Sequence, residues 1–142
     1  MKKHHIFLLL IVSLLSVTLS CTKNAPANKD LLVGSWVAGT YRTDLNNNGI
    51  IDSNEMAYAY PGGEVVTFHS DGSFADDYSG SAIHQAGTWS LGNSDKSLTM
   101  TLPIGHYGGP GTATYQLTKL TSSQLTLYYS GSYSGWMTYT KQ

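Results

Sequence analysis

Ser97-Leu98-Thr99-Met100-Thr101-Leu102 alternates strictly between hydroxyl-bearing and apolar side chains. Because successive side chains of a strand point to opposite faces, this stretch predicts a strand with its apolar residues toward a core. The same period of two returns along the chain, with turn residues between the runs. We therefore expect short strands at residues 33–43, 56–60, 65–68, 73–78, 87–91, 97–102, 112–118, 124–129 and 136–141.

The composition agrees with an all-β protein. Only 12% of the 142 residues are charged, while there are 15 Gly and 10 Tyr, which favours strands and turns over a helix bundle or a coiled coil. Short connections between sequential strands favour an antiparallel meander, and about eight such strands close into a small up-and-down barrel, because closure removes exposed edges. A two-sheet β-sandwich is the alternative. The net charge of -1 argues against a nucleic-acid partner.

The first 20 residues have the pattern of a signal peptide. A short basic start precedes an uncharged, Leu-rich run at residues 6–19, which is shorter than the about 20 residues that a bilayer span needs. Cys21, the only cysteine, follows Leu19-Ser20 and stands where a bacterial lipoprotein signal places its lipidated cysteine. An ordinary secreted protein, cut near the same place, is the alternative.

The lipoprotein interpretation divides the chain into three parts. Residues 1–20 are the signal peptide, residues 21–30 are the lipidated Cys21 with a flexible, polar tether, and residues 31–142 are the barrel domain. We then expect a membrane anchor at Cys21 and a location in the bacterial cell envelope, at the outer membrane. A partner protein in the envelope is compatible with this location.

Four short motifs, in order, resemble those of the small lipocalin-like domains of bacterial lipoproteins, notably of Bacteroidetes. They are Leu32-Val33-Gly34-Ser35-Trp36, Phe68-His69-Ser70-Asp71-Gly72-Ser73-Phe74, Gly87-Thr88-Trp89-Ser90-Leu91 and Leu120-Thr121-Ser122-Ser123-Gln124-Leu125. The resemblance covers roughly residues 31–141 and implies a barrel with Trp36 closing one end. It also implies that Lys141 replaces the arginine that often packs on this tryptophan, or that such a partner is absent.

Residues 44–55 match the twelve-residue calcium loop of an EF-hand. Side-chain oxygens come from positions 1, 3 and 5, a glycine for the sharp turn from position 6, a backbone carbonyl from position 7, and carboxylates from positions 9 and 12. These residues are Asp44, Asn46, Asn48, Gly49, Ile50, Asp52 and Glu55, and Ile51 at position 8 is expected to be buried. Oxygen ligands of this kind suit Ca²⁺.

The segments on both sides of this loop read as strands, so we expect a structural calcium loop joining two strands and no sensor movement. A polar hairpin turn built on Asn48-Gly49 is the alternative, because this dipeptide is a strong turn signal.

Aromatic residues gather in the final hairpin and after the loop. Tyr58, Tyr60, Tyr129 and Trp136 are candidates for a ligand surface at the barrel mouth, although packing alone also favours such residues in strands. We expect a non-enzymatic protein that binds a small apolar or glycan ligand, since no nucleophile, base or catalytic metal set stands out. The alternative is a protein-interaction module, accessory subunit or inhibitor. Asp76-Asp77, whose side chains point to opposite faces of a strand, is interpreted as carrying no chemistry.

Overall fold

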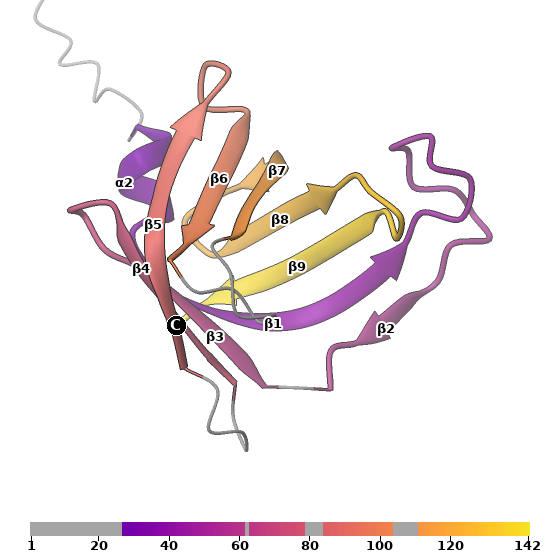
Figure 1. Cartoon of the computed structure of the whole chain (residues 1–142). Coiled ribbons are helices and arrows are strands. Elements are labelled where there is room, and N and C mark those ends of the chain that lie inside the picture. Colours follow the sequence, from indigo (N-terminus) through magenta and orange to yellow (C-terminus); the bar gives the residue numbers. More distant parts are fainter. Residues whose placement is uncertain (1–26, 62, 79–83, 104–110) are drawn as a thin grey trace, which may run out of the picture.

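The computed structural model describes residues 27–61, 63–78, 84–103 and 111–142, and these form nine strands and one short helix (Figure 1). Helix α2 (Asn28–Leu32) comes first. The strands are β1 (Gly34–Thr43), β2 (Ala57–Ala59), β3 (Glu64–Phe68), β4 (Ser73–Tyr78), β5 (His84–Gly92), β6 (Ser97–Leu102), β7 (Gly111–Leu120), β8 (Gln124–Tyr129) and β9 (Gly135–Lys141). The all-β prediction is confirmed.

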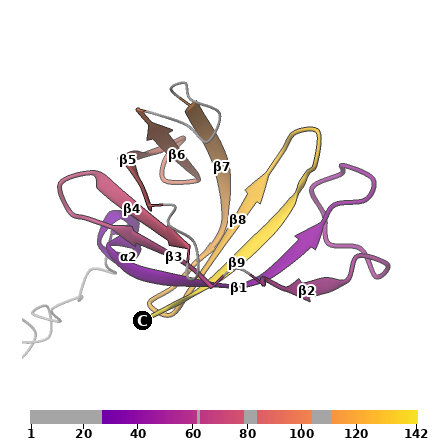
Figure 2. The same ribbon diagram turned by 60° about the horizontal axis from the view of Figure 1, so that its bottom comes forward.

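The strands form a closed antiparallel barrel. From β3 to β9 each strand pairs with the next, β3 pairs with β1, and β9 returns to pair with β1, which closes a barrel of eight strands. Figure 2 shows the two walls of this barrel, with β3 to β6 on one side and β8, β9, β1 and β2 on the other. The predicted barrel is therefore confirmed, and the sandwich alternative is wrong because the hydrogen-bonded ladder has no break between two sheets.

Strand β2 lies outside the eight-stranded count. It pairs with residues 40–42 of β1, on the edge that β3 occupies further back at residues 34–37. All three of its residues are exposed. The segment 56–60 was expected to be a full strand of the meander, but the pairing covers only Ala57–Ala59.

Helix α2 is a second difference from the sequence-based expectation. Residues 28–30 were assigned to the tether, yet they begin a helical turn in which Asp30 N and Leu31 N donate to Ala27 O. Leu32 at the end of this turn is fully buried. The apolar contact of Leu32 with the barrel core explains why so short a helix forms here.

Trp36 closes the barrel end next to α2. Its side chain is fully buried, and its Nε1 donates to Leu32 O at 2.7 Å. The Lys141 ammonium lies 5.0 Å from the centre of the Trp36 ring and donates to Leu31 O at 2.7 Å. Lys141 therefore occupies the place beside the tryptophan that the family resemblance left open.

Gly34 makes this arrangement possible. Its φ of +127° lies in a region that side-chain-bearing residues rarely adopt, and a Cβ at this position would approach Lys141 Cε to 2.8 Å. The glycine two residues before Trp36 thus leaves room for the lysine stem to cross toward the indole.

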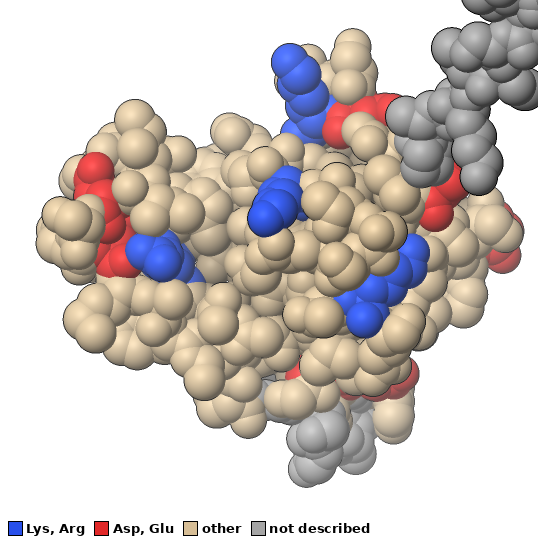
Figure 3. All heavy atoms as spheres, turned by 180° about the vertical axis from the view of Figure 1, so that it is seen from behind, with Lys and Arg blue, Asp and Glu red and all other residues tan. Residues whose placement is uncertain are grey.

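The rest of the core continues from this end into the barrel. Phe68 packs edge-on against Trp89 with ring centres 5.7 Å apart, and Leu98 and Leu125 are almost completely buried beside them. On the surface seen from behind, Lys and Arg side chains stand apart from one another, some beside acidic side chains and others among uncharged residues (Figure 3). No helix among the described residues has the length and apolar character of a membrane span.

Replacing Lys141 by Met tests the contribution of the closed end. The variant keeps an apolar stem but loses the cation over the indole and the hydrogen bond to Leu31 O. We expect the free energy of unfolding to fall by about 1–3 kcal/mol, measured by urea denaturation. Lys119→Met on the exposed face of β7 is the matched control and should change it by less than about 0.5 kcal/mol. Equal losses in the two variants would contradict the role of Lys141.

Candidate functional site

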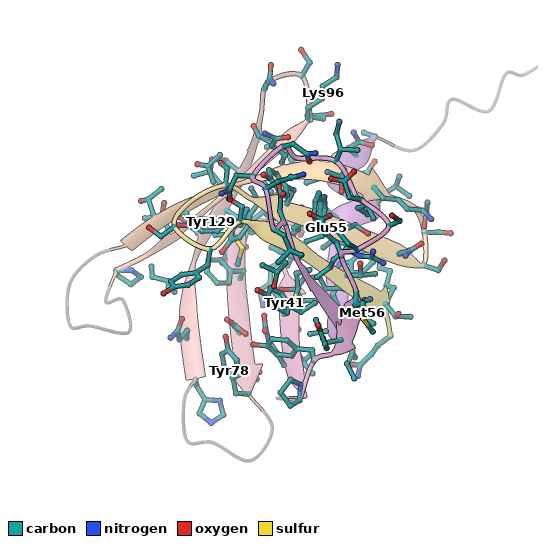
Figure 4. The ribbon with its side chains drawn as sticks, turned by 90° about the vertical axis from the view of Figure 1, so that its right-hand side faces the viewer. Tyr41, Glu55, Met56, Tyr78, Lys96 and Tyr129 are labelled. Atoms are coloured by element: carbon teal, nitrogen blue, oxygen red, sulfur yellow. The ribbon has the colours of Figure 1, made fainter. Side chains whose placement is uncertain are left out.

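A cavity of about 880 Å³ lies in the barrel lumen. Phe68, Phe74 and Leu125 belong both to the core and to the cavity lining, so they form its apolar floor. Seven tyrosines line it among the described residues. Three of these tyrosines are labelled in Figure 4, which views the barrel from the right of Figure 1. They are Tyr41 from β1, Tyr78 from β4 and Tyr129 from β8. The size is that of a pocket for a small organic molecule.

Three of the four aromatic residues singled out from the sequence come together here. Tyr60, Tyr129 and Trp136 all line the cavity, with Trp136 buried and Tyr129 partly exposed at 43%. Tyr58 lies on the short strand β2, is 56% exposed and is not among the lining residues. The expected set is therefore brought together except for Tyr58, because β2 pairs beside the outer half of β1 and does not continue the barrel wall.

Two carboxylates that the sequence analysis did not select also face the cavity. Glu64 opens β3 with 5% of its surface exposed, and Asp76 lies on β4 with 8% exposed. Glu64 is opposite Tyr78 and Asp76 is opposite Val66, so the two acids are diagonal neighbours on one face of the sheet. Such neighbours lie about 7–8 Å apart.

The two carboxylates have different surroundings. Glu64 Oε1 accepts a hydrogen bond from the Tyr139 hydroxyl at 3.1 Å, and Tyr60 is a second hydrogen-bond partner. Burial nevertheless raises the Glu64 pKa, and the hydrogen bonds offset only part of this rise. Asp76 Oδ1 is buried without a hydrogen-bond partner among the described residues. Burial, followed by the charges of Glu64 and Asp77, raises the pKa of Asp76 to about 7.

The structure places Asp76 and Asp77 on opposite faces of β4, as the alternation predicts. The alternation was right, since Asp77 points outward and pairs with His84 at 2.6 Å, while Asp76 follows Phe74 onto the inner face. The signal in the sequence was an acidic residue at an inward position of a strand.

The calcium-like loop leaves the end of β1 and returns at β2. Asp44 and Glu55, its first and last candidate ligands, are each only 3% exposed. Asp44 accepts hydrogen bonds from Asn48 N at 3.2 Å and Gly49 N at 2.8 Å, and the Tyr128 hydroxyl donates to Asp44 Oδ2 at 2.9 Å. Burial opposes ionisation of Asp44, but these hydrogen bonds outweigh it and lower the pKa of the carboxyl.

The other candidate ligands are held by the loop itself. Glu55 accepts from Leu45 N and Asp52 N, both at 2.9 Å. Asp52 Oδ2 accepts from the side-chain amides of Asn46 at 2.8 Å and Asn48 at 3.0 Å. The side-chain atoms that could coordinate a metal are carboxylate and amide oxygens. Their spare lone pairs suit a hard cation. Within the described residues, no group of three or more His, Cys, Asp or Glu side chains is arranged to hold one metal ion.

The loop backbone follows the expected turn. Gly49 has a φ of +72°, as the sharp bend at the sixth position requires. The prediction that Ile51 is buried is wrong, because its side chain is 54% exposed. The loop between β1 and β2 extends beyond the barrel end in Figure 1. Cys21 and the predicted signal peptide lie outside the described residues.

Comparisons with known proteins identify the fold. The chain matches no family model, and no curated protein matches it. Among solved structures it is similar to a lipocalin-like protein from Bacteroides uniformis, with a TM-score of 0.58 and 19% identity over 79% of this chain and 99% of that one. It is also similar to a DUF4847 family protein from Bacteroides vulgatus, with a TM-score of 0.50 and 16% identity over 82% and 99% of the two chains. This chain thus has a lipocalin-like barrel fold.

Proposed function

We propose that this protein binds a small ligand in the barrel lumen and is held in the bacterial envelope by a lipid on Cys21. The observation that carries the binding function is the 880 Å³ cavity in a barrel whose other end is closed by Trp36. An eight-stranded barrel can be filled by its own side chains or can hold one small ligand. Among the described residues, the fully buried side chains of Trp36, Leu32 and Leu98 lie outside the cavity lining.

The lining supports a ligand with an apolar or ring-shaped body, including the ring of a sugar. Phe68, Phe74 and Leu125 offer an apolar floor, while the tyrosines offer both ring faces and hydroxyl groups. The proposal assigns binding and no catalytic step to these residues.

The lipid anchor is proposed from the sequence alone. Cys21 follows a basic start and an apolar run, with Leu19-Ser20 directly before it. The barrel begins at β1, and α2 starts only seven residues after Cys21. A short polar connection of this length would hold the barrel close to the membrane surface.

We further propose that the loop 44–55 binds Ca²⁺ through Asp44, Asn46, Asn48, Ile50 O, Asp52 and Glu55. Support comes from the oxygen donor set and from the φ of +72° at Gly49. The neutral side-chain amides of Asn46 and Asn48 donate hydrogen bonds to Asp52 Oδ2, and a bound cation would supply the positive charge that these amides lack. The ion would stiffen the loop.

An interaction module is the second candidate function, and one observation favours it. Five large apolar side chains are more than half exposed on or beside the loop, namely Leu45, Ile50, Ile51, Met56 and Tyr58. Several exposed large apolar side chains on one segment often mark a place that contacts a partner. If the lumen takes up no ligand, this surface supports the interaction module over the binding protein.

Filling the lumen tests the binding function. Ala113 lines the cavity from β7, so Ala113→Phe places a ring where the ligand would lie. We expect the neutral fluorescent probe N-phenyl-1-naphthylamine to bind the native protein and to bind this variant at least tenfold more weakly. Thr114→Phe, the next residue and outward-facing, should leave the affinity unchanged. Equal binding by all three proteins would place the probe outside the lumen and contradict the proposal.

Calcium titration tests the loop. We expect one site with a Kd on the order of 10⁻⁶ to 10⁻⁴ M, and a Tm several degrees higher in 1 mM Ca²⁺ than in chelator. Asp44→Asn should abolish both effects, because it removes a charge that three hydrogen bonds hold in place. Asp95→Asn in the exposed β5–β6 turn is the control and should respond like the native protein. Absence of calorimetric heat at millimolar Ca²⁺ would leave the loop a polar turn.

Metabolic labelling tests the anchor. Cells that express the full chain should incorporate radioactive palmitate into it, and Cys21→Ser should remove the label and release the protein from the membrane fraction. Ser16→Ala, within the apolar run, is the control and should remain labelled. An unlabelled native protein would refute lipidation.

A further inference from the structure

The lumen carries negative charge without a matching positive group. Glu64 and Asp76 both line the cavity and are more than nine-tenths buried. Among the described residues that line it, none is Lys, Arg or His. Burying a carboxylate costs free energy unless hydrogen bonds or an opposite charge compensate for it. The described residues therefore leave these two buried carboxylates without a positively charged partner, which a ligand could supply.

Asp76 shows this most directly. Its Oδ1 is buried and has no hydrogen-bond partner in the described structure. The residues across the ladder are Val66 on β3, which offers no polar side chain, and Gln85 on β5. An asparagine would avoid the charge at the same size, so packing alone does not require an aspartate at this place.

Aromatic rings surround the two carboxylates. Tyr60 and Tyr139 hydrogen-bond to Glu64, and Tyr78 stands opposite it on β4. Burial and then the charge of Glu64 raise the pKa of Tyr78, Tyr115 and Tyr139, so these phenols remain neutral. Neutral phenol rings attract a cation at their faces. Carboxylates and aromatic faces thus favour the same kind of charge.

We propose that the lumen binds an organic ammonium ion, with the positive nitrogen at Glu64 and Asp76 and an apolar body on the floor formed by Phe68, Phe74 and Leu125. This inference rests on the proposed binding function and specifies the ligand class for the same cavity. The ammonium group donates hydrogen bonds to both acids, including Asp76 Oδ1. A bare metal ion would not use the apolar floor or the volume of about 880 Å³.

Two probes of equal shape separate charge from fit. N-(1-naphthyl)ethylenediamine ends in an ammonium group, and 2-(1-naphthylamino)ethanol ends in a hydroxyl group in its place. At pH 8 and low ionic strength, we expect calorimetry on the purified protein to show at least tenfold tighter binding of the ammonium probe. The double variant Glu64→Gln, Asp76→Asn should bind the two probes equally.

Asp77→Asn is the matched control. It makes the same chemical change one residue along β4, where the side chain points outward and pairs with His84. The preference for the ammonium probe should persist in this variant. Thermal melts establish that the double variant is folded, and its Tm at pH 8 should equal or exceed the native value, because it removes two buried charges.

The dependence on pH gives an independent readout. The titratable groups that face Asp76 are Glu64, Tyr60, Tyr78, Tyr115 and Tyr139, while Asp77 and His84 pair with each other on the outside. With a pKa of about 7, Asp76 is largely neutral at pH 5.5 and charged at pH 8. The preference for the ammonium probe should therefore grow as the pH rises over this range, and Asp76→Asn should flatten the increase.

The outcomes separate this inference from the function on which it rests. Equal native affinities for the two probes at pH 8, with binding lost in Ala113→Phe, would overturn the ammonium ligand and leave lumen binding intact. Absence of binding by either probe, and by neutral N-phenyl-1-naphthylamine, would overturn both. A preference that survives in the double variant would also overturn the inference, because the selectivity would then arise outside Glu64 and Asp76.

Discussion

The structure depends on the burial of Trp36 at one end of the barrel. The indole nitrogen donates to Leu32 O, the Lys141 ammonium lies over the ring, and Gly34 leaves space for the lysine stem. These contacts join α2, β1 and β9, which are the first and last elements of the described chain. Because β1 also pairs with both β3 and β9, fixing this end fixes the seam where the barrel closes.

A core concentrated at one end leaves the other end for function. Leu32 and Leu98 are fully buried in one core cluster with Trp36, while the cavity is lined by tyrosines, two acids and apolar residues such as Met100 and Met137. Leaving the acids there lowers stability, since an uncompensated buried carboxylate disfavours the folded state. Natural proteins place such costs at binding sites, where a ligand offsets them. Under the proposed binding function, the Asp76 position is a compromise between folding and recognition.

Much of the fold was predictable, and the reason lies in the period of two. Leu98 is buried on the predicted inner face and Met100 and Leu102 line the cavity, and Gly34 with Trp36 indicated a closed end. What the pattern could not give is how fully the lumen is filled, because alternation assigns a residue to a face without setting the distance across the barrel. The pattern therefore did not show that Tyr58 lies on a strand that leaves the wall, or that Asp76 faces a cavity.

The loop and the lumen are physically connected. Tyr128 on β8 donates to Asp44 in the loop, and its ring packs on Trp136 with ring centres 5.0 Å apart. Trp136 lines the cavity, and the residue next to Tyr128, Tyr129, lines it too. A change in the order of the loop therefore reaches the cavity wall through two aromatic rings. If the proposed Ca²⁺ binds, an ion that holds Asp44 in place would hold this wall as well, so the proposed calcium loop and the proposed ligand cavity would form a single preorganised site.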